Sequence, residues 1–261
     1  MNPTTMTYTV TDHVAHVRFT RPEAANSVTP AFARDLRDVM LAVESDDEVR
    51  AVSVTAEGKV FCAGGDLKAF AAAGSDVGAL ASDMLVDFHG AIYKMNRIPK
   101  PVVAGVRGSA GGAGLSLTSA FDLVVASSSA KFTMAYTRAG VTPDGTSSYF
   151  LARHIGLRRM LDLTLTNRVL DAAEAEAWGL VNRVVDDAEV DTATADLAAQ
   201  LARGPWAMGM AKRVVYQGFE SPLEQAGEME SETIIRAMGT HDAQEGIAAF
   251  AEKRKPEFRW K

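Results

Sequence analysis

Apolar and polar residues alternate in the first part of this chain, whereas in much of the rest apolar residues recur every three or four positions. Residues 8–10 and 14–19 predict two strands joined by a short turn. Thr29, with Pro30 at the first helical position, predicts the start of a helix whose apolar stripe follows. Residues 49–55 then predict a third strand.

The stretch 101–122 combines an apolar strand, residues 102–106, with a run rich in glycine. The glycines are Gly105, Gly108, Gly111, Gly112 and Gly114. Apolar residues at helical spacing follow, so we expect a turn at a helix N-terminus, where backbone N–H groups can approach a phosphate or an oxyanion. The glycine spacing matches neither the Walker loop nor the dinucleotide fingerprint. Alternatively, the glycines only permit close packing of a helix on a strand.

A second turn of small residues spans 61–68, with the sequence FCAGGDLK, and Asp66 is placed to cap the helix after it. The strand–strand–helix rhythm therefore occurs twice, around residues 49–74 and 102–120. Two such turns could offer N–H groups to one carbonyl oxygen from two sides. That arrangement is an oxyanion hole, in which one donor is worth about 3 kcal/mol of transition-state stabilisation.

Weak patterning at residues 69–78 precedes a predicted helix at 79–97, which ends before two prolines. From Ser147 onward we expect four helical segments, interrupted only by a short strand at 181–185. The last helices carry many apolar side chains: Met208, Met210, Val214, Phe219, Met229, Ile234, Ile235 and Met238. Such faces predict burial against a partner subunit, although they could also cover the chain's own core.

Composition narrows the class of protein. A net charge of −6 argues against a nucleic-acid surface, and a single cysteine, Cys62, excludes an internal disulfide and a cysteine-based metal site. No run approaches the ~18 apolar residues of a membrane span, so we expect no membrane partner. The N-terminus lacks a basic and an apolar region, which leads us to expect no signal peptide and a cytoplasmic location.

The two turns, FCAGGDL at 61–67 and GSAGGAG at 108–114, resemble those of the enoyl-CoA hydratase/isomerase (crotonase) superfamily. Further similarity lies in AKF at 130–132, AEAWGLVNRVV at 175–185 and FAEKR at 250–254. The resemblance covers nearly the whole chain. It implies an α/β fold of the ClpP/crotonase type.

The implied architecture is a spiral of ββα repeats carrying the CoA-ester site in residues 1–200, followed by an all-helical trimerisation region in 201–261. It also implies an acyl-CoA thioester substrate and a homotrimer or hexamer, a hexamer being a dimer of trimers. No metal or redox cofactor is expected, because coenzyme A enters as part of the substrate.

The resemblance also assigns residues by position. The oxyanion-hole amides fall on Gly65 and Ala113, Lys68 lies near the CoA phosphates, and a neighbouring subunit's Phe250 and Lys253 close over the adenine. Lys253 could instead be a charge that favours the C-terminal end of its helix. The other substrate-contacting positions are Ala63, Asp66, Leu67, Gly112, Ser116 and Tyr136.

The chain departs from the family pattern where hydratases carry two glutamates that activate water. Ser116 and Tyr136 stand at those positions, and neither is a carboxylate base near neutral pH. The remaining acid is Asp144, which resembles the aspartate of family isomerases and also the nucleophile of 4-chlorobenzoyl-CoA dehalogenases. His89 matches the water-activating histidine of the dehalogenases. Alternatively, Asp144 caps a helix after a Pro-Asp-Gly turn, and His89 is a partly buried helix residue.

These residues support several functional hypotheses. In the first, Asp144 shifts a double bond by moving a proton from C2 of a 3-enoyl-CoA to C4. In the second, Asp144 attacks an aromatic acyl-CoA ring and His89 activates the water that cleaves the ester. The others are a hydratase with atypical residues and a non-catalytic protein of the same fold that serves in assembly or RNA binding. The acidic balance argues against RNA.

Overall fold

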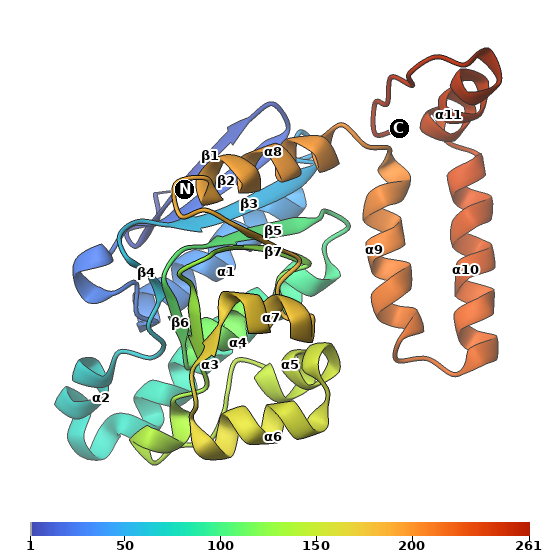
Figure 1. The fold of residues 1–261 in the computed structure, drawn as a ribbon. Helices are drawn as coiled ribbons and strands as arrows, with labels where there is room; N and C mark the ends of the chain where they lie inside the picture. Colours follow the sequence, from blue (N-terminus) through green and yellow to red (C-terminus); the bar gives the residue numbers. More distant parts are fainter. Residues whose placement is uncertain (1) are drawn as a thin grey trace.

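Two sheets built from repeated strand pairs form the centre of the computed structural model, which describes residues 2–261 (Figure 1). The larger sheet has the order β1 (Met6–Thr11), β2 (Val14–Phe19), β3 (Ala51–Ala56), β5 (Val102–Val106), β7 (Leu123–Ser127) and β10 (Arg183–Val185). The smaller has the order β4 (Val60–Cys62), β6 (Ser109–Gly111), β8 (Lys131–Thr133) and β9 (Leu170–Asp171). The predicted N-terminal hairpin is present as β1 and β2, which pair antiparallel.

Each repeat contributes one strand to each sheet. The pairs β3–β4, β5–β6 and β7–β8 follow one another along the chain, and within each sheet these strands lie parallel. Helices α2 (Leu67–Ala73) and α4 (Ala113–Ala120) follow the first two pairs. The glycine-rich stretch thus passes through the short strand β6 before its helix begins, and a third strand pair extends the rhythm that the sequence showed twice.

Helices cover both faces of the larger sheet because its central strands are apolar on both sides. On one face, Val52 and Val54 pack into the core that includes α1 (Pro30–Ser45) and α3 (Val77–Arg97). On the other face, Val103 and Val125 pack against α8 (Val190–Ala202), which crosses the front of the sheet in Figure 1. Helix α1 begins as predicted, with the Thr29 hydroxyl accepting a hydrogen bond from the Phe32 N–H.

Residues 69–78, where the sequence pattern is weak, are helical. They lie in α2, in the short 3-10 helix η2 (Gly74–Asp76) and at the start of α3. By length and mean hydropathy alone, Leu67–Arg97 is apolar enough to cross a membrane, although charged and polar residues interrupt its apolar positions. Its mean hydropathy is high because alanine, leucine and valine stand between isolated charges. Gly74, with φ +53°, separates α2 from α3, and α3 buries one face in the core.

Seven helices, not four, follow residue 146 in the described chain. They are α5 (Ser147–Ile155), α6 (Leu157–Thr166), α7 (Ala172–Trp178), α8, α9 (Trp206–Gly218), α10 (Leu223–Met238) and α11 (His241–Glu252). Glycine accounts for part of the error, since Gly156, with φ +84°, ends α5 where the apolar pattern continues into α6. The strand β9 was also missed, because two residues carry no periodicity.

Helices α9, α10 and α11 stand to one side of the sheets (Figure 1). Many of their apolar side chains are exposed in the single chain: Val215, Phe219, Leu223, Ile234, Ile235, Met238, Ile247 and Phe250. A buried ion pair fastens α9 to the core, with Lys212 Nζ 2.8 Å from Asp122 Oδ2 and Tyr216 donating to Asp122 Oδ1 at 3.0 Å. Helices α9 to α11 are therefore attached to the core through α9, and their apolar faces are uncovered in the single chain.

Candidate active site

The two small-residue turns lie against each other where β4 and β6 end. Gly64 has φ +106°, and a Cβ at that position would lie 2.8 Å from the carbonyl oxygen of Gly111. Gly112, with φ +50°, is the N-cap of α4. A side chain at Gly64 would therefore push the turns apart, and its left-handed backbone also favours glycine.

Two backbone N–H groups at this junction have no partner in the described chain. Gly65 forms an isolated parallel bridge with Val28, in which the Val28 N–H donates to the Gly64 oxygen at 2.8 Å and the Asp66 N–H donates to the Val28 oxygen at 3.1 Å. In such a bridge the N–H of Gly65 itself points away from Val28. Ala113 is the first residue of α4, so its N–H has no acceptor within the helix. Within residues 2–261, neither group donates a hydrogen bond.

A cavity of about 340 Å³ opens in front of these amides. Both turns contribute to its wall through Ala63, Gly65, Gly112 and Ala113. Helices α2 and α3 supply most of the apolar wall, with Leu67, Phe70, Val77, Ala81, Met84, Leu85 and Phe88. The combination of two free N–H groups and an apolar wall suits a thioester carbonyl that is joined to a hydrocarbon group.

Asp144 is the only carboxylate among the residues that line this cavity. It follows the 3-10 helix η3 (Tyr136–Ala139) and precedes α5, and its Oδ1 accepts a hydrogen bond from the Tyr136 hydroxyl at 2.5 Å. Burial raises the pKa of Asp144, while the Tyr136 hydrogen bond and nearby His89 act in the opposite direction. A carboxylate whose pKa is raised is suited to take up and return a proton.

Ser116 and Tyr136 form one buried cluster with that acid. The Ser116 oxygen lies 2.7 Å from the Tyr136 oxygen, and both residues are almost fully buried. Burial and the charge of Asp144 raise the pKa of Tyr136 well above its usual range, so the phenol stays protonated and donates. Neither position holds a carboxylate that could bind and activate a water molecule.

His89 reaches the same loop from α3 but does not line the cavity. Its Nε2 accepts a hydrogen bond from the Gly145 N–H at 3.2 Å. In this arrangement His89 positions the backbone next to Asp144, and its Nε2 lone pair is already engaged.

The structure brings together only part of the predicted site. Asp66 caps α2 through the N–H groups of Lys68 and Ala69, and the lysine side chain is outside the cavity. Phe250 and Lys253 lie at the end of α11, on the opposite side of the molecule from α2 (Figure 1). Within one chain they are far from Lys68, so any role at the same ligand requires a second subunit.

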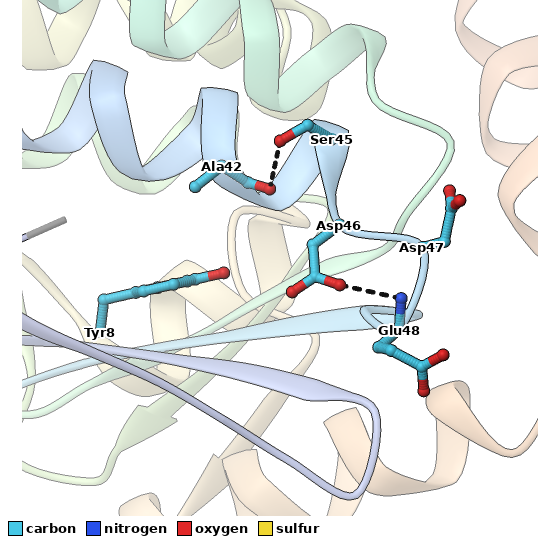
Figure 2. Close-up of a pocket in the computed structure, with 6 residues that line it drawn as sticks. All are labelled: Tyr8, Ala42, Ser45, Asp46, Asp47 and Glu48. Carbon is cyan, nitrogen blue, oxygen red and sulfur yellow. Dashed lines mark hydrogen bonds between the residues drawn. The ribbon is translucent and has the colours of Figure 1, made fainter.

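A separate surface depression of about 510 Å³ is lined by Tyr8, Ala42, Ser45, Asp46, Asp47 and Glu48 (Figure 2). The Asp46 carboxylate is engaged there, because it accepts a hydrogen bond from the Glu48 N–H at 2.9 Å. Three acidic side chains disfavour an anionic ligand such as a CoA ester. Among residues 2–261 no cluster of histidine, cysteine and acidic side chains suited to a metal is found.

Sequence comparison with known families decides the assignment. Residues 9–261 match the family described as enoyl-CoA hydratase/isomerase. The chain belongs to this family. The resemblance inferred from the two turns is thereby confirmed, and so is the crotonase fold. The chain is a crotonase-family enzyme of acyl-CoA thioesters.

Relatives within the crotonase family carry different names. The chain is 36% identical over 245 residues to 4-chlorobenzoyl coenzyme A dehalogenase-2 of an Arthrobacter species, covering 93% of this chain and 89% of the relative. It is 32% identical over 246 residues to 1,2-epoxyphenylacetyl-CoA isomerase of Escherichia coli, covering 92% and 93%. The crystal structure of an enoyl-CoA hydratase from Polaromonas superimposes with a TM-score of 0.93 at 31% identity, covering 97% of this chain and 99% of that one.

Several cavity residues escaped sequence reasoning. Phe70, Val77 and Ala81 lie on α2 and α3, in or next to the segment with weak patterning. Ala139 ends η3, and Val141 lies in the loop that carries Asp144. Exposure marks them in the structure, because Val77 and Val141 are apolar side chains that the core does not cover. Exposure cannot be read from the sequence, so no sequence signal indicated an acyl pocket.

Proposed function

We propose that this crotonase-family protein is an enoyl-CoA isomerase that shifts a double bond along an acyl-CoA thioester. The observation that carries the proposal is that one carboxylate, Asp144, lines a cavity in which two backbone N–H groups of the described chain are free. A 1,3-proton shift needs one base on one face of the substrate. Hydration needs in addition a positioned water, for which the residues that line the cavity include no second carboxylate.

In the proposed reaction the thioester oxygen accepts hydrogen bonds from the N–H groups of Gly65 and Ala113. The free N–H end of α4 adds its dipole, so the negative charge of an enolate is stabilised. Asp144 takes the proton from C2 of a 3-enoyl-CoA, which moves the electron pair into the dienolate, and returns the proton to C4. The apolar wall excludes water, which would otherwise solvate the carboxylate and weaken the base.

A panel of acyl-CoA esters assayed with the wild type tests the proposal. We expect 3-hexenoyl-CoA to be converted to the 2-enoyl isomer, detected by the absorbance of the conjugated thioester. Saturated esters of the same length serve as binding controls. Binding of the saturated ester without conversion of the 3-enoyl ester would contradict the isomerase assignment.

The absence of a second carboxylate among the residues that line the cavity leads to a separate prediction about hydration. Because Ser116 and Tyr136 cannot hold a water as two carboxylates do, crotonyl-CoA hydration should be weak. The loss of absorbance at the conjugated thioester, followed in the same preparation, gives the hydration rate. A rate equal to or above that of isomerisation would show that another group activates water.

A dehalogenase is the second candidate, favoured by the 36% identity with 4-chlorobenzoyl coenzyme A dehalogenase-2. In that reaction a carboxylate oxygen of Asp144 would bond to the ring carbon and release halide, after which water would cleave the aryl ester. The engaged Nε2 of His89 disfavours this candidate, since a water-activating histidine needs a free lone pair. Halide release from 4-chlorobenzoyl-CoA, without conversion of 3-hexenoyl-CoA, would decide for it.

The exposed apolar faces of α9 to α11 predict assembly. Side chains such as Phe219, Ile235 and Phe250 are each more than two-thirds exposed in the single chain, an arrangement typical of an unpaired subunit interface. We propose a homotrimer, in which Phe250 and Lys253 could reach a neighbour's site. Multi-angle light scattering at micromolar concentration should give three times the 27.8 kDa chain mass, or six times for a hexamer. A stable monomer would contradict the proposal.

A further inference from the structure

Two hydroxyl groups and one carboxyl group, each from a different element, form one chain of hydrogen bonds inside the site. Ser116 lies on α4, Tyr136 opens η3, and Asp144 lies in the loop before α5. The oxygen–oxygen distances are 2.7 Å from Ser116 to Tyr136 and 2.5 Å from Tyr136 to Asp144 Oδ1. Ser116 is fully buried and Tyr136 is 7% exposed, so water does not compete for these hydrogen bonds.

The direction of the hydrogen bonds follows from proton counting. An ionised Asp144 only accepts, so the single proton of the Tyr136 hydroxyl is donated to Oδ1. The Tyr136 oxygen is then an acceptor toward Ser116, whose hydroxyl must donate. Within the described chain, the other acceptor in reach of the Ser116 hydroxyl is the Gly112 oxygen, at the longer distance of 3.3 Å. The chain of hydrogen bonds therefore runs from Ser116 through Tyr136 to Asp144.

The backbone around Gly145 keeps Asp144 close to Ser116 and Tyr136. Gly145, with φ +58°, follows Asp144, and a Cβ there would lie 2.8 Å from the Ser116 Cβ and 2.9 Å from a ring carbon of Phe88. The Gly145 N–H is held by His89 and the Asp144 carbonyl accepts from the Ser147 hydroxyl at 3.0 Å. The loop is thus held by contacts with α3, α4 and α5. Among the residues that the structure describes, none donates a hydrogen bond to Asp144 Oδ2.

We propose that Ser116 and Tyr136 are positioning residues that hold Asp144 through Oδ1 and leave Oδ2 as the oxygen that exchanges protons with the substrate. The proposal rests on the proposed proton-transfer function of Asp144. The hydrogen-bond chain stabilises the ionised form of the base through a donor that cannot itself deprotonate near neutral pH. It also excludes a water molecule from Oδ1, because the phenol occupies that side of the carboxylate.

Removing the phenol hydroxyl should change the base without changing the pocket. Tyr136→Phe keeps the ring that lines the cavity but removes the donor, so the ionised carboxylate loses a charge-assisted hydrogen bond. We expect the pKa of Asp144 to rise by about 1–2 pH units. The acid limb of the kcat/KM profile should move to higher pH by the same amount, and kcat should fall about 10-fold or more while KM changes little.

Ser116→Ala should shift the pKa of Asp144 in the same direction by a smaller amount, because its effect passes through Tyr136. In the Tyr136→Phe background the Ser116→Ala change should have no further effect on the pKa of Asp144, since the hydrogen-bond chain is already broken at Tyr136. Ser119→Ala is the matched control on the same helix. Ser119 is also buried, but its hydroxyl donates to the Ser116 carbonyl at 2.7 Å and not to Tyr136. We expect its profile to equal that of the wild type.

The pKa of Asp144 can be read without any substrate. Carboxyl carbon NMR titration of the ¹³C-aspartate-labelled protein, with the resonance assigned by its loss in Asp144→Asn, gives the value for each variant. The groups that face Asp144 in the structure are Tyr136 from η3 and His89 from α3, with Ser116 behind the phenol. A His89→Gln variant checks that the shift does not arise from the imidazole.

The outcomes separate this proposal from the isomerase assignment. If the wild type does not convert 3-enoyl-CoA but Tyr136→Phe still raises the NMR pKa, the hydrogen-bond chain stands and the proposed reaction fails. If Asp144 titrates identically in the wild type and Tyr136→Phe, the hydrogen-bond chain does not act on the base, and the proposal is overturned. An additional shift from Ser116→Ala in the Tyr136→Phe background would likewise overturn the serial arrangement.

Discussion

Asp144→Asn is expected to lower the turnover of 3-enoyl-CoA by about 10²–10⁴-fold, the usual contribution of a positioned acid–base group. The amide side chain keeps the size of the carboxylate, and its oxygen can still accept the Tyr136 hydrogen bond, but it cannot take the substrate proton. Binding of a saturated acyl-CoA should change little, because the N–H groups of Gly65 and Ala113 are untouched. Initial rates and calorimetric binding measured on one preparation separate the two effects.

The same substitution should not cost stability near neutral pH. Burial raises the folded-state pKa of Asp144 above the value in the unfolded chain, so folding favours the protonated acid. That contribution is present at low pH and is lost as the pH rises through the folded-state pKa. Asp144→Asn removes this titration, and its free energy of unfolding relative to the wild type should be higher at pH 7 than at pH 4.

Two controls make the result decisive. Asp144→Glu should retain part of the isomerase activity, because a base tolerates a small displacement better than a nucleophile does. His89→Gln should have a modest effect in an isomerase, whereas in a dehalogenase it should cause a covalent Asp144 aryl ester to accumulate, visible by mass spectrometry. Turnover of Asp144→Asn at the wild-type rate would show that Asp144 does not transfer the substrate proton, and the structure gives it no capping role instead, because its carboxylate accepts from Tyr136 and not from an N–H group of α5.

The elements that sequence patterning predicted best are those whose signal is local. The hairpin of β1 and β2, the Thr29 cap and the Asp66 cap each depend on residues within a few positions of one another. The two turns were also recognisable, since glycine appears where a side chain would strike another backbone, as at Gly64. Local stereochemistry therefore predicts the two turns from sequence, whereas the family resemblance assigned the donor N–H groups to Gly65 and Ala113.

The parts that escaped prediction depend on contacts between distant segments. Nothing in the spacing of Ser116, Tyr136 and Asp144 indicates that their oxygens form one line, because three different elements present them. The apolar cavity wall that α2 and α3 supply was not predicted for another reason. Alanine and glycine give little periodicity, so the helix was expected to begin only at residue 79. Tertiary packing assigns these residues a role that their composition does not indicate.

A substitution at the close contact between α4 and β4 is expected to have the second large effect. Gly114 is the second residue of α4, and a Cβ there would lie 2.1 Å from the Cys62 carbonyl oxygen and 2.9 Å from the Cys62 Cβ. Ordinary contacts between such atoms are about 3.5 Å, so Gly114→Ala must separate α4 from β4 by roughly 1 Å. Ala113 is the first residue of α4, and Gly65 lies in the turn directly after β4, so the two N–H groups would move apart with these elements.

Gly114→Ala is therefore expected to lower the free energy of unfolding by about 1–3 kcal/mol, as overpacked cores do, and kcat/KM for 3-enoyl-CoA by about 10²-fold. Gly78→Ala is the matched control, because Gly78 is the second residue of α3 and a Cβ there meets nothing within 4 Å. That variant should gain up to about 1 kcal/mol from helix propensity and keep its activity. Urea unfolding and initial rates measure both. If Gly114→Ala matched the wild type in stability and rate, α4 could move without cost, and the spacing of the two N–H donors would not depend on this glycine.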